Sequence, residues 1–255
     1  MAKIAIFDSG FGSLSVIKPI KKKVKADIVY FADQKNFPYG TKNVSHLRNI
    51  IKSTIARLQR NFHPNLIVVA SNTPSLLLKT IVKKPYIIGI FPPLKEAARN
   101  TKTKVIAILG TKVVVESNIL ENYIKRNVPK NIKVLKINAS PLVELVESGT
   151  FINNKKFCKA KIELILSPLL KNSVDVATLS STHLPFLLPM LKEIFPDIIF
   201  LDPANSVADQ IKKILNRKMS KKCTLKIFTS GDAKKFHKQL LKIGIKNKVF
   251  SLRFS

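Results

Sequence analysis

The sequence predicts an α/β fold built on parallel sheets, and three observations carry this prediction. Short runs rich in Ile and Val recur along the 255 residues, segments with helical spacing lie between most of them, and each run ends in a polar or glycine-containing corner. Apolar runs without alternation are typical of strands buried on both faces of a parallel sheet. A hydrophobic content of 45% fits a globular chain with one large or two modest domains.

The individual elements follow from these patterns. Three segments have the apolar spacing of amphipathic helices, namely 43–61, 154–172 and 204–218. Pro168 should kink or end the second of them, because proline removes a backbone donor. The first helix should bury one face made of Leu47, Ile50, Ile51, Ile55 and Leu58. The clearest predicted strands are residues 3–9, 27–33, 65–72, 86–91, 104–111, 133–140, 174–181 and 197–203.

The charge of the chain allows two interpretations. Lys and Arg number 45 against 15 Asp and Glu, so the net charge is +30. Such a charge would attract nucleic acid or an anionic membrane surface. The alternative is a lysine-biased proteome that coats an ordinary soluble surface. The second interpretation is favoured, because the lysines are spread along the whole chain and form no basic tail.

Cysteine usage and hydropathy predict a soluble, cytoplasmic protein. Cys158 and Cys223 lie far apart and show no metal-type spacing, which fits a reduced compartment and no metal site. The first apolar run is too short for the core of a signal peptide. No apolar run approaches the roughly 20 residues of a membrane span, so no membrane partner is expected.

Polar residues gather at the carboxyl ends of the predicted strands, where parallel α/β sheets place their binding sites. Hydroxyls and backbone N–H groups at such corners suit a small anion such as a carboxylate. Any single corner could instead be a helix N-cap, since the same residue types are the preferred caps. Taken together, the corners suggest one polar cleft, and they are Asp8-Ser9-Gly10, Asp33, Ser71-Asn72-Thr73, Gly110-Thr111, Ser180-Ser181-Thr182-His183 and Asp202.

Four ordered motifs carry a resemblance to a known family. They read IAIFDSGFGSLSVIKPI, VYFADQKNFPYGTKN, IVVASNTPS and LSSTHLPFLLP. They resemble the glutamate racemases, within the aspartate/glutamate racemase superfamily, whose stretches read much like FDSGxGGLTV, YFGDxxxxPYGTKS, VVACNTAS and LGCTHYPLL. The resemblance extends from about residue 3 to about residue 236, nearly the whole chain.

The resemblance implies two similar α/β domains that face each other across a cleft. The expected division is 1–92 plus 203–255 for the first domain and 93–202 for the second. Members of the family use no cofactor, interconvert L- and D-glutamate for peptidoglycan synthesis, and often form homodimers.

The two catalytic positions of the family are changed in this chain. In the family each domain supplies one cysteine, and the two flank the Cα of the substrate. The matching residues here are Ser71 and Ser181, and neither Cys158 nor Cys223 falls on a motif. A thiol has a pKa of about 8.5 and ionises readily, whereas a serine hydroxyl needs an adjacent base. We therefore expect two-base racemisation by this route to be lost or much weakened.

Other positions match the family better. The resemblance makes Asp8 the assistant of Ser71 and His183 the assistant of Ser181, with Glu147 supporting His183. Asp8 could activate Ser71 or act as the base, and His183 could activate Ser181 as in hydrolases; His183 could equally be a structural residue at a strand end. The positions matching those that hold the substrate's carboxylates and amine are Ser9, Tyr39, Gly40, Asn72, Thr73 and Thr182.

Three hypotheses about function result. The first is a protein that binds glutamate or a related dicarboxylic amino acid with little or no racemase activity. The second is a working glutamate racemase in which Ser replaces Cys, so whether the protein is an enzyme stays open at this stage. The third is a non-catalytic basic protein that binds nucleic acid, which the charge alone suggests.

Overall fold

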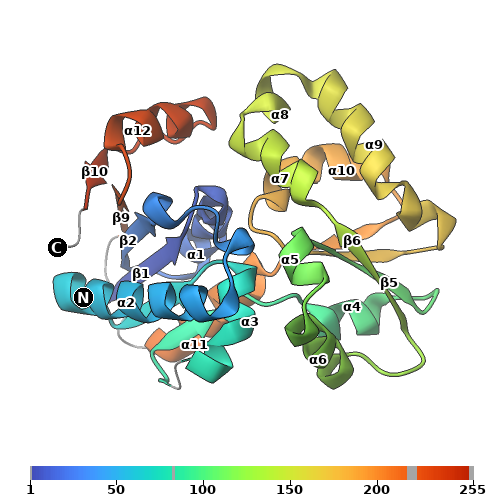
Figure 1. The fold of residues 1–255 in the computed structure, drawn as a ribbon, viewed down its shortest axis with the longest axis horizontal. Helices are drawn as coiled ribbons and strands as arrows, with labels where there is room; N and C mark the ends of the chain where they lie inside the picture. Colours follow the sequence, from blue (N-terminus) through green and yellow to red (C-terminus); the bar gives the residue numbers. More distant parts are fainter. Residues whose placement is uncertain (1, 82–83, 217–222, 253–255) are drawn as a thin grey trace. The chain divides into compact units, whose positions relative to one another are not determined.

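The computed structural model describes residues 2–81, 84–216 and 223–252. The chain divides into two compact units, of which unit 1 comprises Met1–Ile90 and Ala204–Ser255 and unit 2 comprises Phe91–Pro203. Each unit is a parallel β-sheet with helices on both of its faces (Figure 1). The predicted α/β class is therefore confirmed.

Unit 1 is built on a sheet of six described strands in the order β10-β9-β2-β1-β3-β4. Every neighbouring pair in it is parallel. Strand β1 lies between β2 and β3, and Ile4, Ile6 and Phe7 on it are fully buried. The strands are β1 (Lys3–Asp8), β2 (Asp27–Ala32), β3 (Leu66–Val69), β4 (Ile87–Gly89), β9 (Thr224–Thr229) and β10 (Val249–Ser251).

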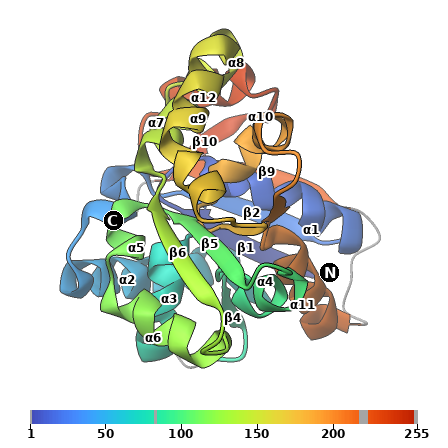
Figure 2. The same cartoon turned by 90° about the vertical axis from the view of Figure 1, so that its right-hand side faces the viewer.

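The helices of unit 1 cover both faces of this sheet. Helix α1 packs against α11 and α2 against α3, and Figure 2 shows the two pairs on opposite faces. Helix α2 is capped by Asn43, whose side chain accepts a hydrogen bond from the backbone N–H of His46 at 2.8 Å. The predicted apolar face of α2 is confirmed as buried. The helices are α1 (Ile17–Lys23), α2 (Val44–Phe62), α3 (Asn72–Ile81), α11 (Ala204–Leu215) and α12 (Ala233–Lys242), with 3-10 turns η1 (Gly12–Val16), η2 (Gln34–Asn36) and η3 (Tyr39–Thr41).

Unit 2 is built on a sheet of four described strands in the order β6-β5-β7-β8, again all parallel. One expectation was wrong here. Strand β6 is not buried on both faces, and both Lys133 and Lys136 on it are exposed. The reason is its place at the sheet edge, where one side has no neighbouring strand. The strands are β5 (Val105–Gly110), β6 (Lys133–Asn138), β7 (Val176–Leu179) and β8 (Ile199–Leu201).

Helices α9 and α10 lie on one face of the unit 2 sheet, and α4 and α6 lie on the other (Figures 1 and 2). Helix α9 runs through Pro168 and ends at Lys171. Proline leaves the carbonyl of Leu164 without its helical donor, and the Ser167 hydroxyl donates to that carbonyl at 3.1 Å. The helices are α4 (Leu94–Asn100), α5 (Lys112–Val115), α6 (Asn118–Asn127), α7 (Ser140–Glu147), α8 (Thr150–Asn153), α9 (Lys155–Lys171) and α10 (Leu188–Ile194), with the turn η4 (Leu184–Leu187).

The C-terminal part of unit 1 departs most from the predicted elements. Strands β9 and β10 and helix α12 were not among the clear predictions. In β9 the polar residues Thr224 and Lys226 alternate with apolar ones, so the strand does not form a continuous apolar run. The helix predicted over 204–218 is α11, which ends at Leu215, and residues 217–218 lie outside the described part of the chain.

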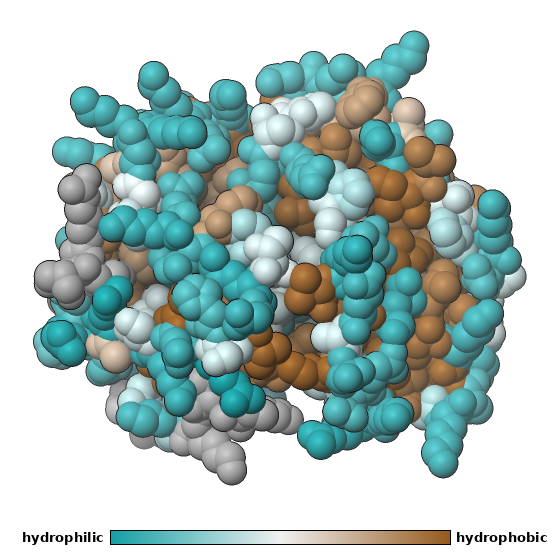
Figure 3. All heavy atoms as spheres, in the orientation of Figure 1, coloured by the Kyte–Doolittle hydropathy of each residue, from teal (hydrophilic) through white to brown (hydrophobic). Residues whose placement is uncertain are grey.

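Within the described residues, no helix has the length and apolar character that a membrane crossing requires. On the face drawn in Figure 3, hydrophilic side chains are spread over both units.

Candidate functional site

The two sheets each bring a set of polar side chains to the carboxyl edge of their strands. In unit 1, β2 and β3 flank β1 in parallel register, so their ends lie next to one another. Asp8 ends β1, Asp33 follows β2, and Ser71 follows β3 shortly after Val69. A backbone hydrogen bond links the ends of β1 and β2, since the N–H of Asp33 donates to the carbonyl of Asp8 at 2.7 Å. The predicted gathering of these three corners at one edge is therefore seen within unit 1.

Asp8 and Ser9 form the first part of this corner. The Asp8 carboxylate is 2% exposed and accepts a hydrogen bond from the backbone N–H of Ser9 at 2.7 Å. The Ser9 hydroxyl in turn accepts one from the backbone N–H of Tyr39 at 3.3 Å. These bonds fix the turn η3, which carries Tyr39 and Gly40, against the end of β1.

Asp33, which the sequence predicted as one of the strand-end polar residues without a specific role, accepts the most side-chain hydrogen bonds described in this network. Its carboxylate accepts from the Tyr39 hydroxyl at 2.9 Å, the Asn36 amide at 2.8 Å and the Ser230 hydroxyl at 3.1 Å. Ser230 follows β9, so the C-terminal segment contributes to a corner otherwise made by the first 75 residues. A buried carboxylate with three donors holds its neighbours rigidly.

Tyr39 is held as a neutral hydrogen-bond donor. Burial raises its pKa well above 10, and the negative charge of Asp33, the hydrogen bond to Asp33 and the charge of Asp8 raise it further. A hydrogen bond with the Thr54 side chain on α2 acts weakly in the opposite direction. The Tyr39 hydroxyl therefore stays protonated throughout the physiological pH range.

Ser71 and Asn72 stand at the start of α3. The carbonyl of Ser71 accepts the first helical bond from the N–H of Ser75 at 3.0 Å, which is the position of an N-cap. The Ser71 hydroxyl, however, forms no hydrogen bond with the described part of the chain. Asn72 is 4% exposed, and both its Oδ1 and its Nδ2 are buried without a partner among the described residues. Helix α3 also packs against η3, so Asn72 shares a corner with Tyr39 and Gly40.

Ser75 explains why the start of α3 is fixed at this edge. Its buried hydroxyl donates to the carbonyl of Val69 at 2.8 Å and accepts from the N–H of Ile90 at 2.9 Å, so it links the ends of β3 and β4. Gly89 is needed at this point, because a Cβ there would lie 2.8 Å from atoms of Leu78 and Ser75. The helix start that carries Asn72 is thus held by a close contact that only glycine permits.

The corner of unit 2 follows β7. Ser181, Thr182 and His183 are all buried, and the hydroxyl of Ser181 accepts from the backbone N–H of His183 at 3.5 Å. The preceding Ser180 shares a hydrogen bond with Thr178 at 2.9 Å. The hydrogen bond described between Ser181 and His183 therefore comes from the backbone of the histidine and not from its ring.

The His183 ring is paired with a carboxylate. Its Nε2 lies 2.5 Å from Oε1 of Glu147, and the two side chains are 8% and 20% exposed. Glu147 is the last residue of α7, which packs against η4 directly after His183. Packing therefore brings together two residues that are 36 positions apart in the sequence.

Comparison with known proteins gives the family. The chain is 31% identical over 243 residues to the protein named glutamate racemase 2 of Caldanaerobacter subterraneus subsp. tengcongensis, covering 91% of this chain and 89% of that protein. The chain belongs to the glutamate racemase family. No family model matches it.

Solved glutamate racemases have the same fold. The crystal structure of a glutamate racemase isoform from Bacillus anthracis superposes with a TM-score of 0.86 at 25% identity, covering 99% of this chain and 98% of that one. The Escherichia coli glutamate racemase, solved with L-glutamate and the activator UDP-MurNAc-Ala, gives a TM-score of 0.82 at 23% identity, covering 99% and 98%. At the lower identity the likeness concerns the fold alone.

Two groups at the strand ends of this glutamate racemase family member escaped the site prediction. Ser230 was missed because its hydrogen bond to Asp33 depends on a contact between distant segments. Thr111 was noted only as a strand-end residue. Its Oγ1 is buried without a partner among the described residues, like the amide of Asn72. Among the described residues there is no cluster of three His, Cys, Asp or Glu side chains that could hold a metal ion.

Proposed function

We propose that this member of the glutamate racemase family binds glutamate or a related dicarboxylic amino acid, and that the strand-end corner of unit 1 contributes to the binding site. We further propose that binding needs no cofactor and that two-base racemisation is lost or much weakened. The observation that carries the binding proposal is the Asn72 side chain, whose donor and acceptor atoms are both buried and have no hydrogen-bond partner in the described part of the chain.

An unpaired buried amide is costly unless a ligand completes it. Leaving a buried polar group unsatisfied costs about 1–3 kcal/mol, so native proteins rarely tolerate a pair of such atoms in one side chain. The Asn72 Nδ2 can donate to a carboxylate and its Oδ1 can accept from an ammonium group. An amino acid carries both groups on one carbon, which is why this chemistry suits it. The nearby hydroxyls of Ser71 and Thr73 and the N-terminus of α3 add donors for a carboxylate.

The loss of racemisation is argued from the groups available for proton transfer. Ser71 and Ser181 occupy the positions of the two thiols in the family motifs. A serine hydroxyl works as a base only when a stronger base takes its proton. Within the described part of the chain neither serine hydroxyl is hydrogen-bonded to the side chain of such a base, since none is described for Ser71 and Ser181 accepts from the backbone N–H of His183. Neither face of the substrate Cα would then meet a group whose pKa is suited to the task.

One experiment tests both parts of the proposal. Purified protein is incubated with L- or D-glutamate in D₂O, exchange at Cα is followed by NMR, and thermal unfolding is measured with the same ligands. We expect a rise in melting temperature with glutamate but not with the neutral isostere glutamine, together with no exchange. Exchange at a rate typical of an enzyme would overturn the loss of catalysis, and the absence of any shift with diacids would overturn the binding.

Family membership favours a second candidate, a working glutamate racemase in which Ser71 and Ser181 act with Asp8 and His183. Because racemisation requires the Cα proton to leave, the same exchange measurement decides between the two. The nucleic-acid hypothesis has less support, since the lysines are spread along the whole sequence and form no basic tail.

A further inference from the structure

Unit 1 contains a groove between α1 and the segment that follows α12. The groove has a volume of about 380 Å³. Leu225 belongs to its lining, and as the second residue of β9 it pairs with Ile28 near the start of β2. The groove therefore reaches the amino edge of the sheet, opposite the carboxyl edge that carries Ser71.

The base of the groove is apolar. The Phe228 ring on β9 packs against Phe62 of α2, with 5.0 Å between the ring centres. Side chains alternate along a strand, so Leu225 faces the other side of the sheet, where α1 lies. Leu225 and Ile245 are each half-buried, so both present apolar surface to the groove. The apolar residues of the lining are Leu14, Ile17, Leu225 and Ile245.

The turn after α12 forms one wall and is well fixed. Gly244 has a φ of 80°, and the backbone N–H of Ile245 donates to the carbonyl of Leu240 at 2.9 Å. This is the glycine-terminated helix end that brings the following residue back beside the helix. The Asn247 side chain then donates to the carbonyl of Leu225 at 3.2 Å, which links this wall to β9.

Helix α1 forms the opposite wall, and that wall is cationic. Lys18, Lys21 and Lys22 line the groove, and their spacing of three and four residues places them on one side of the helix. Lys23 serves a different purpose, because its ammonium lies 2.7 Å from the carboxylate of Asp209 on α11. The three groove lysines are exposed and form no ion pair with the described part of the chain, and no acidic side chain lines the groove.

We propose that this groove binds a medium-chain aliphatic carboxylate, with the alkyl chain on the apolar base and the carboxylate beside the lysines of α1. Burial of hydrocarbon on Leu225 and Ile245 stabilises the chain, and the uncompensated positive charge of the wall attracts the head group. The volume lies toward the lower end of the range of roughly 300–1,000 Å³ that is usual for small-molecule sites, which suits one short chain. The groove requires nothing from the proposed amino-acid site.

An NMR titration of the ¹⁵N-labelled full chain with octanoate, below the concentration at which it forms micelles, tests the proposal. We expect saturable shifts of the backbone signals of Leu14, Ile17, Leu225 and Ile245. Hexanoate should bind about tenfold more weakly, because each CH₂ group removed from water contributes about fourfold. Equal affinities for the two acids would overturn the placement of the chain on the apolar base.

Replacement of the lysines tests the head group. Lys18→Gln with Lys21→Gln and Lys22→Gln should weaken octanoate by about fivefold, the effect expected of ion pairs at exposed positions. The same triple variant should leave the binding of uncharged 1-octanol unchanged. The melting temperature should not fall, because the three side chains are exposed.

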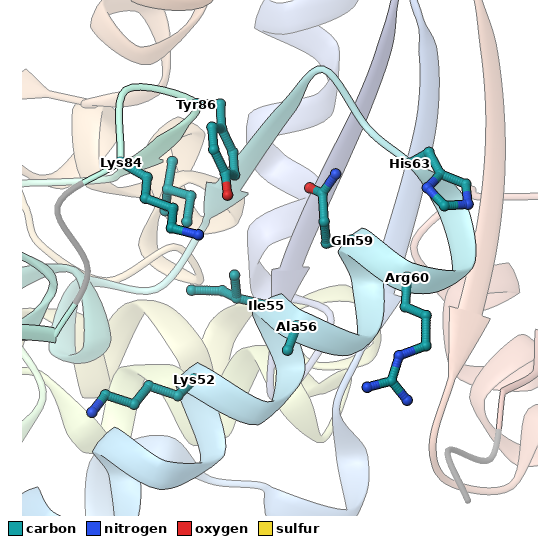
Figure 4. A pocket seen from close by; sticks show the side chains of 9 residues that line it. Lys52, Ile55, Ala56, Gln59, Arg60, His63, Lys84 and Tyr86 are labelled. Atoms are coloured by element: carbon teal, nitrogen blue, oxygen red, sulfur yellow. The ribbon is translucent and has the colours of Figure 1, made fainter.

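The matched control removes three cations from another concavity of the same unit. Lys52, Arg60 and Lys84 line a cavity beside α2, which covers the other face of the sheet (Figures 2 and 4). In Figure 4 the Arg60 side chain extends to the opposite side of α2 from Lys84, so these cations form no single wall. Lys52→Gln with Arg60→Gln and Lys84→Gln should change the affinity for octanoate by less than about twofold.

Three results would overturn the proposal. The first is the absence of saturable shifts with octanoate. The second is equal weakening by the two triple variants, which would show attraction by net charge only. The third is binding of phosphatidylglycerol vesicles through the three lysines of α1 when octanoate does not bind, which would indicate contact with a membrane surface.

Discussion

The strand-end corners of the two units share a sequence pattern, but they differ in whether their polar side chains are hydrogen-bonded within the described chain. Both follow a buried strand and both begin with a serine, Ser71 after β3 and Ser181 after β7. In unit 1 the residue after the serine, Asn72, is buried, and two of its side-chain atoms have no hydrogen-bond partner within residues 2–81, 84–216 and 223–252. In unit 2 the His183 ring is already paired with Glu147 and the Ser181 hydroxyl accepts a backbone bond.

The difference separates two ways of building a binding site. The described contacts of Ser181 and His183 after β7 are internal, so they contribute to the stability of the fold, whereas the Thr111 hydroxyl after the neighbouring β5 is buried without a partner among the described residues. The unit 1 corner leaves an amide that only a ligand can complete, so it costs stability until it is filled. Replacement of the Asn72 amide and replacement of the Glu147 partner of His183 should therefore change the free energy of unfolding in opposite directions, while the chemistry depends on the two serines that the corners share.

The largest effect is expected when both serines are replaced by cysteine. Ser71→Cys with Ser181→Cys supplies a group of pKa about 8.5 on each face, and each positioned acid or base contributes about 10²–10⁴-fold. We expect the rate of glutamate racemisation, measured by circular dichroism, to rise by at least about 10³-fold.

The single cysteine variants are the matched controls for this change. Each places a thiol on one face only, so each should show slow racemisation and exchange at Cα with only one enantiomer. A double variant as inactive as the native chain would mean that the defect extends beyond the two serines.

The second-largest effect is a loss of stability, expected when the pair between Glu147 and the His183 ring in unit 2 is removed. Glu147→Ala removes the partner of the buried His183 ring, and a hydrogen bond that involves a charged group is worth about 1.5–3 kcal/mol. Urea unfolding should show a loss of that size. Glu144→Ala, at a position on the same helix with no described side-chain bond, is the control and should change stability by less than about 0.5 kcal/mol. Equal losses would show that the pair with His183 is not what matters.

How far the sequence predicted these corners depends on whether a feature is local. Strands β1, β3 and β7 were predicted because their apolar runs are continuous, and the polar residues at their ends follow from parallel topology. Strand β9 was not predicted, because Lys226 interrupts its pattern where the sheet is only partly covered. A run of apolar residues in the sequence indicates that a strand is buried. It does not identify a partly exposed strand that forms because it pairs with a segment far away in the sequence.

The contacts within the corners show the same limit. Ser230 donates to Asp33 across 197 residues of sequence, and no local signal marks that pair. The partner of His183 was expected from the family resemblance and not from spacing. The unpaired state of Asn72 could not be predicted by either route, because it depends on which donors and acceptors fail to reach it in the fold.

A third prediction concerns the rigid network beneath the unit 1 corner. Tyr39→Phe removes one of the three donors to Asp33, and the free energy of unfolding should fall by about 1–2 kcal/mol. The pKa of Tyr39 is raised in the folded chain, whereas an unfolded tyrosine ionises near pH 10. Stability from this proton is present below about pH 10 and is lost as the pH rises further.

The dependence of the free energy of unfolding on pH, above about pH 10, tests the cause assigned to this loss. The stability difference between the native chain and Tyr39→Phe should shrink as the pH rises above about 10, because only the native chain loses the Tyr39 contribution there. A pH-independent difference for Tyr39 would contradict the assigned cause.

The smallest change in stability is also the one that tests the comparison most directly. Asn72→Leu replaces an unpartnered amide by an apolar side chain of similar shape, so the protein without ligand should gain about 1 kcal/mol in free energy of unfolding. The same variant should lose the rise in melting temperature with glutamate, because the donor and acceptor for the amino acid are gone. Thr178→Val is the matched change in unit 2, where a buried hydroxyl with described partners is removed, and it should lose stability. A loss of stability in both variants would mean that the Asn72 amide is satisfied in the native protein, and the distinction between an open and a completed corner would then fail.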